Sequence, residues 1–200
     1  MIIKFFVFLQ RLSKGIGTRI STLICKKRLG NVGIGTRIRS HCLLKGDSLK
    51  NVKIGSGCYI DTNNVIECSA RLVKSGKTVS PKLTIGNGCN FGEYNHITAV
   101  NRIVIGDNLL TGRFVLITDN SHGLFEMVEL NKHPSHRQVV SKGEVVIGDN
   151  VWLGDKVSIL PGVHIGDGCI IGANSVVTHD VPNFSIAAGN PAKVIKQIIQ

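Results

Sequence analysis

The 200-residue sequence predicts a parallel β-helix, and three observations support this fold class. Aromatic residues make up only 5% of the chain, so the core has to be built from Ile, Val and Leu. Gly directly follows several of the aliphatic residues that recur at every sixth position, a pattern typical of coils in which three short strands close one turn. The aliphatic positions are clearest in residues 145–181, at Ile147, Leu153, Ile159, Ile165, Ile171 and Val177. Gly suits the corners of such a coil because adjacent turns approach closely there.

The N-terminal segment, residues 1–33, is predicted to be a basic helical or capping segment. Residues 1–53 contain 12 basic residues and one acidic residue, Asp47, whereas the remainder contains 12 of each, so the net charge of +11 lies near the N-terminus. Such a cluster attracts anionic surfaces. Apolar residues fall at helical spacing beside basic ones, at Ile2, Phe5, Phe6, Leu9 and Leu12.

Two interpretations of this helix stay open: it lies on a membrane surface, or it caps the open end of the coil. We expect neither a signal peptide, because no small-residue cleavage site follows the apolar run, nor a membrane span, which needs about 20 apolar residues.

The coil is expected over residues 34–182, followed by a C-terminal tail with a short helix over 183–200. The hexapeptide Gly-Ile-Gly-Thr-Arg-Ile occurs twice, at 15–20 and at 33–38. An earlier start would place Thr22 and Arg28 in inward positions, so we begin the coil near Ile34. The inward positions of this first turn would then be Ile34, Ser40 and Gly46, an irregular set that a terminal turn tolerates.

Ile-Gly pairs at 34, 54, 85, 105, 147 and 165 mark the first strand of six turns, and one turn takes 18 residues. The excess spacing predicts two-residue bulges at two corners, a 13-residue loop within residues 67–82, and a 24-residue excursion at about 118–144. Among the inward positions of the last five turns, only Thr111 is not apolar.

The six cysteines show neither a CxxC pair nor zinc-ligand spacing. Cys58, Cys89 and Cys169 occupy one slot, four residues after an inward Ile. We therefore interpret them as reduced core residues of a cytoplasmic protein.

The long excursion is the predicted functional segment, because long loops in compact folds are usually functional. It opens with Ile117-Thr-Asp-Asn-Ser-His-Gly123. A hydroxyl group is a weak nucleophile unless a base removes its proton, and the unperturbed pKa of His suits that base. Asp119, three residues before His122, either orients the imidazole or caps the turn. The backbone N–H of Gly154 is expected to stabilise the oxyanion that forms when such a hydroxyl attacks a carbonyl group.

These features resemble the hexapeptide-repeat acyltransferases, in particular bacterial sugar O-acetyltransferases of the maltose, galactoside, O-antigen and capsule types. The resemblance covers residues 34–196 and implies a left-handed β-helix, homotrimers with sites between subunits, acetyl-CoA as co-substrate and His122 as general base. It also implies coenzyme contacts at Trp152, Asp155, Ala173, Thr178, His179, Lys193 and Lys196. Three positions depart from the galactoside enzymes: Asp155 replaces a small hydroxyl residue, His179 replaces Lys, and Gly92 replaces a substrate-binding Asn.

The predicted function is transfer of an acetyl group from acetyl-CoA to a sugar hydroxyl in O-antigen or capsule biosynthesis. The protein is expected in the cytoplasm, with a peripheral contact to the inner face of an anionic membrane if the helix lies on that surface. The alternatives are an amino-sugar N-acetyltransferase and a non-catalytic scaffold that binds an anionic surface. The sequence lacks the His-x4-His pair of the zinc-binding γ-class carbonic anhydrases, so we predict no metal site. It also lacks aromatic residues interleaved with the basic run, which argues against nucleic acid as a partner.

Overall fold

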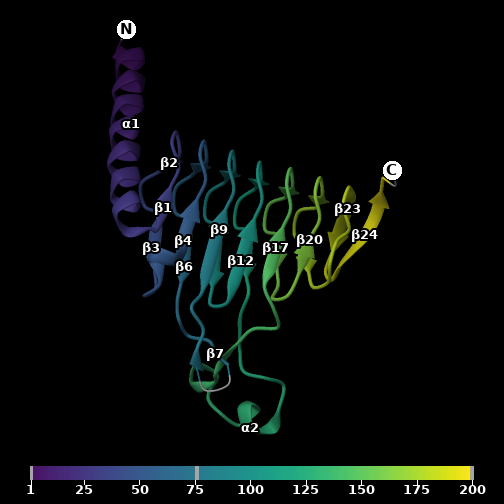
Figure 1. The fold of residues 1–200 in the computed structure, drawn as a ribbon. Coiled ribbons are helices and arrows are strands. Elements are labelled where there is room, and N and C mark those ends of the chain that lie inside the picture. The colour runs from purple at the N-terminus through teal and green to yellow at the C-terminus, as the bar shows by residue number, and fades with distance from the viewer. Residues whose placement is uncertain (1, 75–76, 199–200) are drawn as a thin grey trace.

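The chain is wound into a parallel β-helix with three sheet faces, which confirms the predicted fold class (Figure 1). The computed structural model describes residues 2–74 and 77–198. We name the faces A, B and C in the order in which the chain meets them. Face A contains β1 (Asn31–Val32), β4 (Val52–Ile54), β9 (Lys82–Ile85), β12 (Arg102–Ile105), β17 (Val145–Ile147) and β20 (His164–Ile165).

Face B contains β2 (Arg37–Ile38), β5 (Tyr59–Ile60), β10 (Asn90–Phe91), β13 (Leu110–Thr111), β18 (Trp152–Leu153), β21 (Ile170–Ile171), β23 (Ser185–Gly189) and β24 (Ala192–Gln197). Face C contains β3 (Leu43–Lys45), β6 (Val65–Cys68), β11 (His96–Ala99), β14 (Leu116–Thr118), β19 (Ser158–Ile159) and β22 (Val176–Val177). Because the strands are two to five residues long on most turns, each contributes one or two side chains to the interior.

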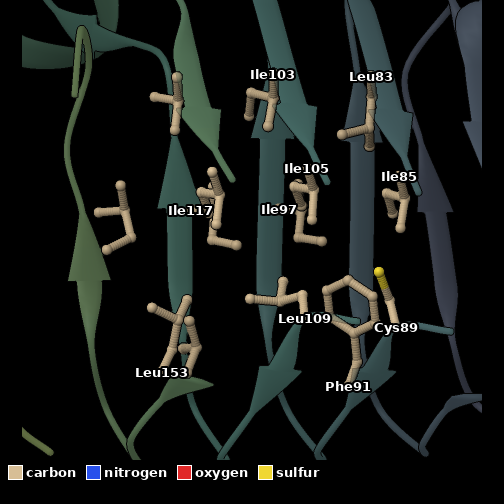
Figure 2. Close-up of a cluster of buried hydrophobic side chains, with 14 of the residues drawn as sticks. Leu83, Ile85, Cys89, Phe91, Ile97, Ile103, Ile105, Leu109, Ile117 and Leu153 are labelled. Atoms are coloured by element: carbon tan, nitrogen blue, oxygen red, sulfur yellow. The ribbon is translucent and has the colours of Figure 1, made fainter. Parts of the chain in front are cut away.

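The interior is a stack of aliphatic side chains, one above another on successive turns (Figure 2). Ile85, for example, pairs in register with Ile105, which pairs with Ile147 on the next turn. Thr111, the one polar residue in these stacks, is satisfied internally because its hydroxyl accepts a 2.6 Å hydrogen bond from the amide of buried Asn95. The predicted register is therefore correct for the last five turns.

In the first turn our predicted register is wrong by two residues. Val32 pairs with Ile54, Ile38 with Ile60, and Leu44 with Ile66, so these three residues fill the inward positions instead of Ile34, Ser40 and Gly46. Ile34 is 87% exposed at a corner. The first turn is consequently as apolar as the others, and the 3₁₀ helix η1 (Leu49–Asn51) takes up the additional residues before β4.

Helix α1 (Ile2–Arg28) lies within the segment predicted to be helical or capping, and its C-terminal half covers the open end of the coil (Figure 1). Cys25 and Leu29 are buried there, and the backbone N–H of Ile38 donates to the Thr22 hydroxyl at 2.9 Å. The side chains of residues 2–14, which carry the predicted apolar face, lie outside the described residues. In the part of the chain that the structure describes, no helix is both long and apolar enough to cross a membrane.

Both large insertions leave the coil at the edge where face C ends and face A begins, and they project from the same side (Figure 1). The first forms the hairpin of β7 (Val73–Lys74) and β8 (Lys77–Thr78). The second contains β15 (Ser121–His122), α2 (Met127–Leu130), the 3₁₀ helix η2 (Pro134–His136) and β16 (Val139–Val140). Their positions agree with the two loops predicted from the spacing.

The C-terminus is a strand, so the predicted short helix is wrong. β23 continues the coil past residue 182 by pairing in parallel with β21, and β24 then pairs antiparallel with β23. The physical reason is the sheet edge: β23 presents a row of backbone N–H and C=O groups that a strand satisfies and a helix does not.

The three repeated cysteines pack in the core as predicted. The thiols of Cys58, Cys89 and Cys169 lie 3.1 to 3.2 Å from backbone carbonyls of the next turn, those of Gly86, Gly106 and Pro182. Each of the three residues is no more than 1% exposed. A small sulfur side chain therefore fills the corner and also bonds a carbonyl that the turn leaves available.

Candidate functional site

His122 stands at the base of the long loop, the segment formed by residues 118–144. It lies on β15, where it pairs with Val139 of β16 in an antiparallel ladder. The backbone N–H of the next residue, Gly123, donates to Gln138 at 2.7 Å, and Gly123 has a positive φ of 80°. This two-stranded ladder fixes the backbone of His122 while its side chain stays exposed to solvent.

Glu129 holds the two arms of the loop together. Its carboxylate accepts hydrogen bonds from the Lys132 ammonium group and from the backbone N–H of Gln138. The hydrogen bond from Lys132 holds the pKa of this carboxyl below its ordinary value. Because Gln138 also pairs with Gly123, Glu129 links helix α2 to the ladder that carries His122.

Asp119 does not orient His122. Its side chain is fully buried, and its two oxygens accept the backbone N–H groups of Val100 at 2.9 Å and Asn101 at 2.8 Å. No hydrogen bond joins Asp119 to His122, both of which are described. Of the two roles left open by the sequence, the structure supports the turn cap.

Trp152 lies on the outer side of face B, in one row with Lys196, another residue predicted to bind the coenzyme. It pairs with Ile170, which pairs with Ile186, which pairs in turn with Lys196 of β24. The indole is 50% exposed. The structure therefore brings Trp152 and the C-terminal hairpin, including Lys193, onto the same face.

Gly154 and Asp155 are occupied in holding the corner that follows β18. The Gly154 N–H donates to the Ile171 carbonyl at 2.9 Å, so it is not available for an oxyanion, and that expectation is wrong. The Asp155 carboxylate accepts the Arg113 N–H at 2.8 Å. The physical reason is that each turn must satisfy its backbone groups through the neighbouring turn.

The remaining predicted coenzyme residues lie at two corners of the coil. Ala173 follows β21 at the corner between faces B and C. Thr178 and His179 follow β22 at the corner between faces C and A, where the Thr178 hydroxyl lies 2.8 Å from Nδ1 of His179. This is the same edge from which the His122 loop leaves, two turns earlier in the stack.

Within one chain the predicted site falls into two parts. The corner between faces C and A lies opposite face B in a coil of three faces. His122, Thr178 and His179 therefore stand at that corner, whereas Trp152 and Lys196 stand on the opposite face. A single copy does not bring the predicted base and these coenzyme residues together.

Gly92, one of the three departures, is fixed by packing. A Cβ at this position would lie 2.4 Å from the Gly112 carbonyl oxygen, and the Gly92 N–H donates to the Thr111 hydroxyl at 3.1 Å. A larger residue would displace the next turn, so position 92 itself has no side chain with which to contact an acceptor.

Sequence reasoning missed a group of apolar side chains that the long loop exposes. Phe125 is 94% exposed, and Leu124, Met127 and Val128 are between 50% and 72% exposed. The run Gly-Leu-Phe-Glu-Met-Val in a loop of otherwise polar character was the available signal. Among the described residues, no three His, Cys, Asp or Glu side chains gather closely enough to hold a metal ion.

Comparison with known proteins supports the resemblance seen in the sequence. The family described as bacterial transferase hexapeptide (six repeats) matches residues 144–179. WbbJ of Escherichia coli K12, named for lipopolysaccharide biosynthesis and O-acetyl transfer, is 43% identical over 109 residues, covering 52% of this chain and 55% of its own. Galactoside O-acetyltransferase of the same organism is 38% identical over 118 residues, covering 56% and 53%. The chain thus spans about half the length of these curated relatives.

Among solved structures, AntD, an N-acyltransferase from Bacillus cereus in complex with dTDP and 3-hydroxybutyryl-CoA, superposes with a TM-score of 0.69. The two chains are 19% identical, and 90% of this chain and 88% of AntD are covered. At that identity the likeness concerns the fold, which is the left-handed form of the parallel β-helix.

Proposed function

We propose that this chain, whose C-terminal turns carry the bacterial transferase hexapeptide repeat, transfers an acetyl group from acetyl-CoA to a sugar hydroxyl. The observation that carries the proposal is the exposed His122, held on a short ladder at the base of the one long loop of a hexapeptide coil. The curated relatives named as O-acetyltransferases, at 38% and 43% identity, favour a hydroxyl acceptor. The name of WbbJ favours an acceptor in cell-surface polysaccharide assembly.

In the proposed mechanism His122 acts as general base. Its imidazole takes the hydroxyl proton as the oxygen attacks the thioester carbonyl, and a tetrahedral intermediate forms. The carbon–sulfur bond then breaks, and the coenzyme thiolate receives the proton back from the imidazolium. Proton transfer of this kind contributes roughly 10²- to 10⁴-fold to the rate.

The donor is proposed to lie along face B, against Trp152. Lys193 and Lys196 of the C-terminal hairpin would meet its phosphates, because ammonium groups bind phosphate as point charges. Ala173 and Asp155 border the same face at its corner with face C. Thr178 and His179 are too far around the coil to contact that donor from the same subunit, so they would contact one bound by a neighbour.

This division supports a homotrimer with sites between subunits. The exposed apolar side chains of the long loop, Phe125 foremost, supply a surface that a second copy would cover. Placed against the outer side of face B of a neighbour, the loop would carry His122 toward Trp152 of that neighbour. Leu110, Trp152 and Ile170 make that face apolar as well.

We also propose a cytoplasmic location with a peripheral contact to an anionic membrane through α1. The helix exposes Ile16, Ile20 and Leu23, and the basic run Lys26-Lys27-Arg28 follows in its last turn. A helix with an apolar stripe and basic flanks suits the interface of an anionic bilayer.

Calorimetric titration with coenzyme A tests the enzyme proposal. Binding, together with acetyl transfer to sugar hydroxyls, is the expected result. Binding with transfer to amino sugars only would favour the N-acyl alternative, the activity named for AntD. No heat and no thermal stabilisation at millimolar coenzyme would leave the non-catalytic scaffold as the better explanation.

A further inference from the structure

A large hollow lies at the N-terminal end of the molecule, between α1 and the first two turns of the coil. Its volume is about 740 Å³, within the range of small-molecule sites. Its charged lining comes from Arg19 and Lys26 of the helix and from Arg37 and Arg39 of the first turn, and Tyr59 of the second turn completes it. We propose that this hollow binds the phosphate or diphosphate group of a ligand.

Three of the four basic side chains that line the hollow are unpaired within the described part of the chain. Arg39 is paired with Asp61 at 2.7 Å. Within the described part of the chain, the side chains of Arg19, Lys26 and Arg37 make neither an ion pair nor a hydrogen bond, and no acidic residue lines the hollow. Like charges gathered around one space repel each other, and an anion between them relieves that repulsion. Guanidinium groups suit phosphate in particular, because their N–H donors match its oxygens in pairs.

Both copies of the repeated hexapeptide contribute to the hollow. The two copies of Gly-Ile-Gly-Thr-Arg-Ile have different backbones, since residues 15–20 are helical and residues 33–38 form a corner and β2. Nevertheless the Thr-Arg pairs of both copies, Thr18-Arg19 and Thr36-Arg37, line the same hollow. A common backbone conformation does not explain the repeat. A common position beside the hollow, where each copy places a guanidinium group, does explain it.

This hollow is separate from the surface proposed for the coenzyme. Arg37 stands on face B, as Trp152 does, but β2 and β18 are four strands apart, which is roughly 19 Å at the usual strand spacing. Lys196 on β24 is seven strands from β2, roughly 34 Å. One phosphate group cannot contact both basic clusters.

Two sources supply the same chemistry: a soluble nucleoside diphosphate or the phosphate of a lipid headgroup. Leu23 lines the hollow, and Ile20 is exposed on the same helix, so a lipid would find apolar surface nearby. The probes are therefore inorganic pyrophosphate, a nucleoside diphosphate, and vesicles of phosphatidylcholine with and without phosphatidic acid.

The test compares the whole chain with the variants R19Q, R37Q and R19Q/R37Q, by calorimetry for the soluble probes and by flotation for the vesicles. We expect each single substitution to weaken binding of at least one phosphate probe by about 10- to 100-fold, the loss typical of a hydrogen bond to a charged group. Preference for the nucleotide or for phosphatidic acid vesicles identifies the source. K26Q is a second variant in case an arginine substitution disturbs the fold.

Two controls separate a site from general attraction. K27Q removes the same charge from the next residue of α1, whose side chain does not line the hollow, and should change affinity less than about twofold. K196Q removes a charge from the proposed coenzyme surface and so measures any probe that binds there, and the loss caused by R19Q/R37Q should persist when K196Q is also present. Absence of binding for all probes, or equal losses in R37Q and K27Q, would overturn the inference. Neither result depends on whether the chain is an acetyltransferase.

Discussion

Val100 donates its backbone N–H to the carboxylate of Asp119 on the next turn, at 2.9 Å. The second carboxylate oxygen accepts the N–H of Asn101, so the two-residue bulge between β11 and β12 is capped from one side chain. An Asn at 119 would keep one acceptor and would turn an NH₂ group toward the other N–H.

The first prediction follows from this geometry: D119N should destabilise the fold by about 1–3 kcal/mol, the cost of an unsatisfied buried group. Turnover per folded molecule should change little. Thermal or denaturant unfolding measures the first quantity and steady-state kinetics the second. A large loss of turnover with unchanged stability would return Asp119 to the role of orienting His122.

The second prediction concerns the base. H122A should lower turnover by roughly two to four orders of magnitude and leave coenzyme affinity nearly unchanged, because a base acts on the transition state. H133A and H136A are matched controls from the same loop and should retain most activity. If H122A kept more than about a tenth of the wild-type turnover, proton transfer to bulk water would have to replace the base.

The third prediction separates donor binding from chemistry. K196Q should weaken coenzyme A binding by about 10-fold through loss of a charged contact to phosphate, with little change in turnover at saturation. H179A should also weaken coenzyme binding. D180N is its control and should leave the affinity nearly unchanged, because it removes a charge from the neighbouring residue, which has no proposed coenzyme contact. Titration calorimetry gives the affinities. Unchanged affinity in both K196Q and H179A would show that the donor lies elsewhere.

The fourth prediction addresses assembly. Replacing Phe125 by Ser should shift a trimer toward smaller species without lowering the stability of the single chain, because this side chain is 94% exposed in one copy. Sedimentation velocity at several concentrations measures the change. F184S, another exposed Phe at the end of the coil, is the control. A wild-type monomer at micromolar concentration would refute the trimer and the shared site.

The fifth prediction tests the N-terminal helix. The chain should float with vesicles that contain anionic lipid, in a salt-sensitive manner, and deletion of residues 2–14 should abolish flotation. The deletion keeps Thr22, Cys25 and Leu29, which close the coil, so the melting temperature should change little. Undiminished flotation of the deleted chain would leave α1 with the capping role alone.

The coil and its insertions could be predicted from the residues alone, because the inward positions repeat with a fixed period and each requires the same kind of side chain. Ile54, Ile85, Ile105, Ile147 and Ile165 were predicted to stack, and they do. The same periodicity located both insertions, since any excess over one turn must leave the coil. It also placed His122 on the long loop.

The first turn, the C-terminus and the grouping of the site became clear only from contacts between turns. Val32 and Ile34 are both apolar and lie two residues apart in the sequence. Only the pairing of β1 with β4 shows which of them points inward. The C-terminal strand forms because a neighbouring edge needs partners, a requirement that local sequence does not express. Asp119, three residues from His122 in sequence, bonds instead to a turn 19 residues earlier. The contacts that decide these roles join residues distant in sequence, and a periodic pattern specifies only what each turn shares with the others.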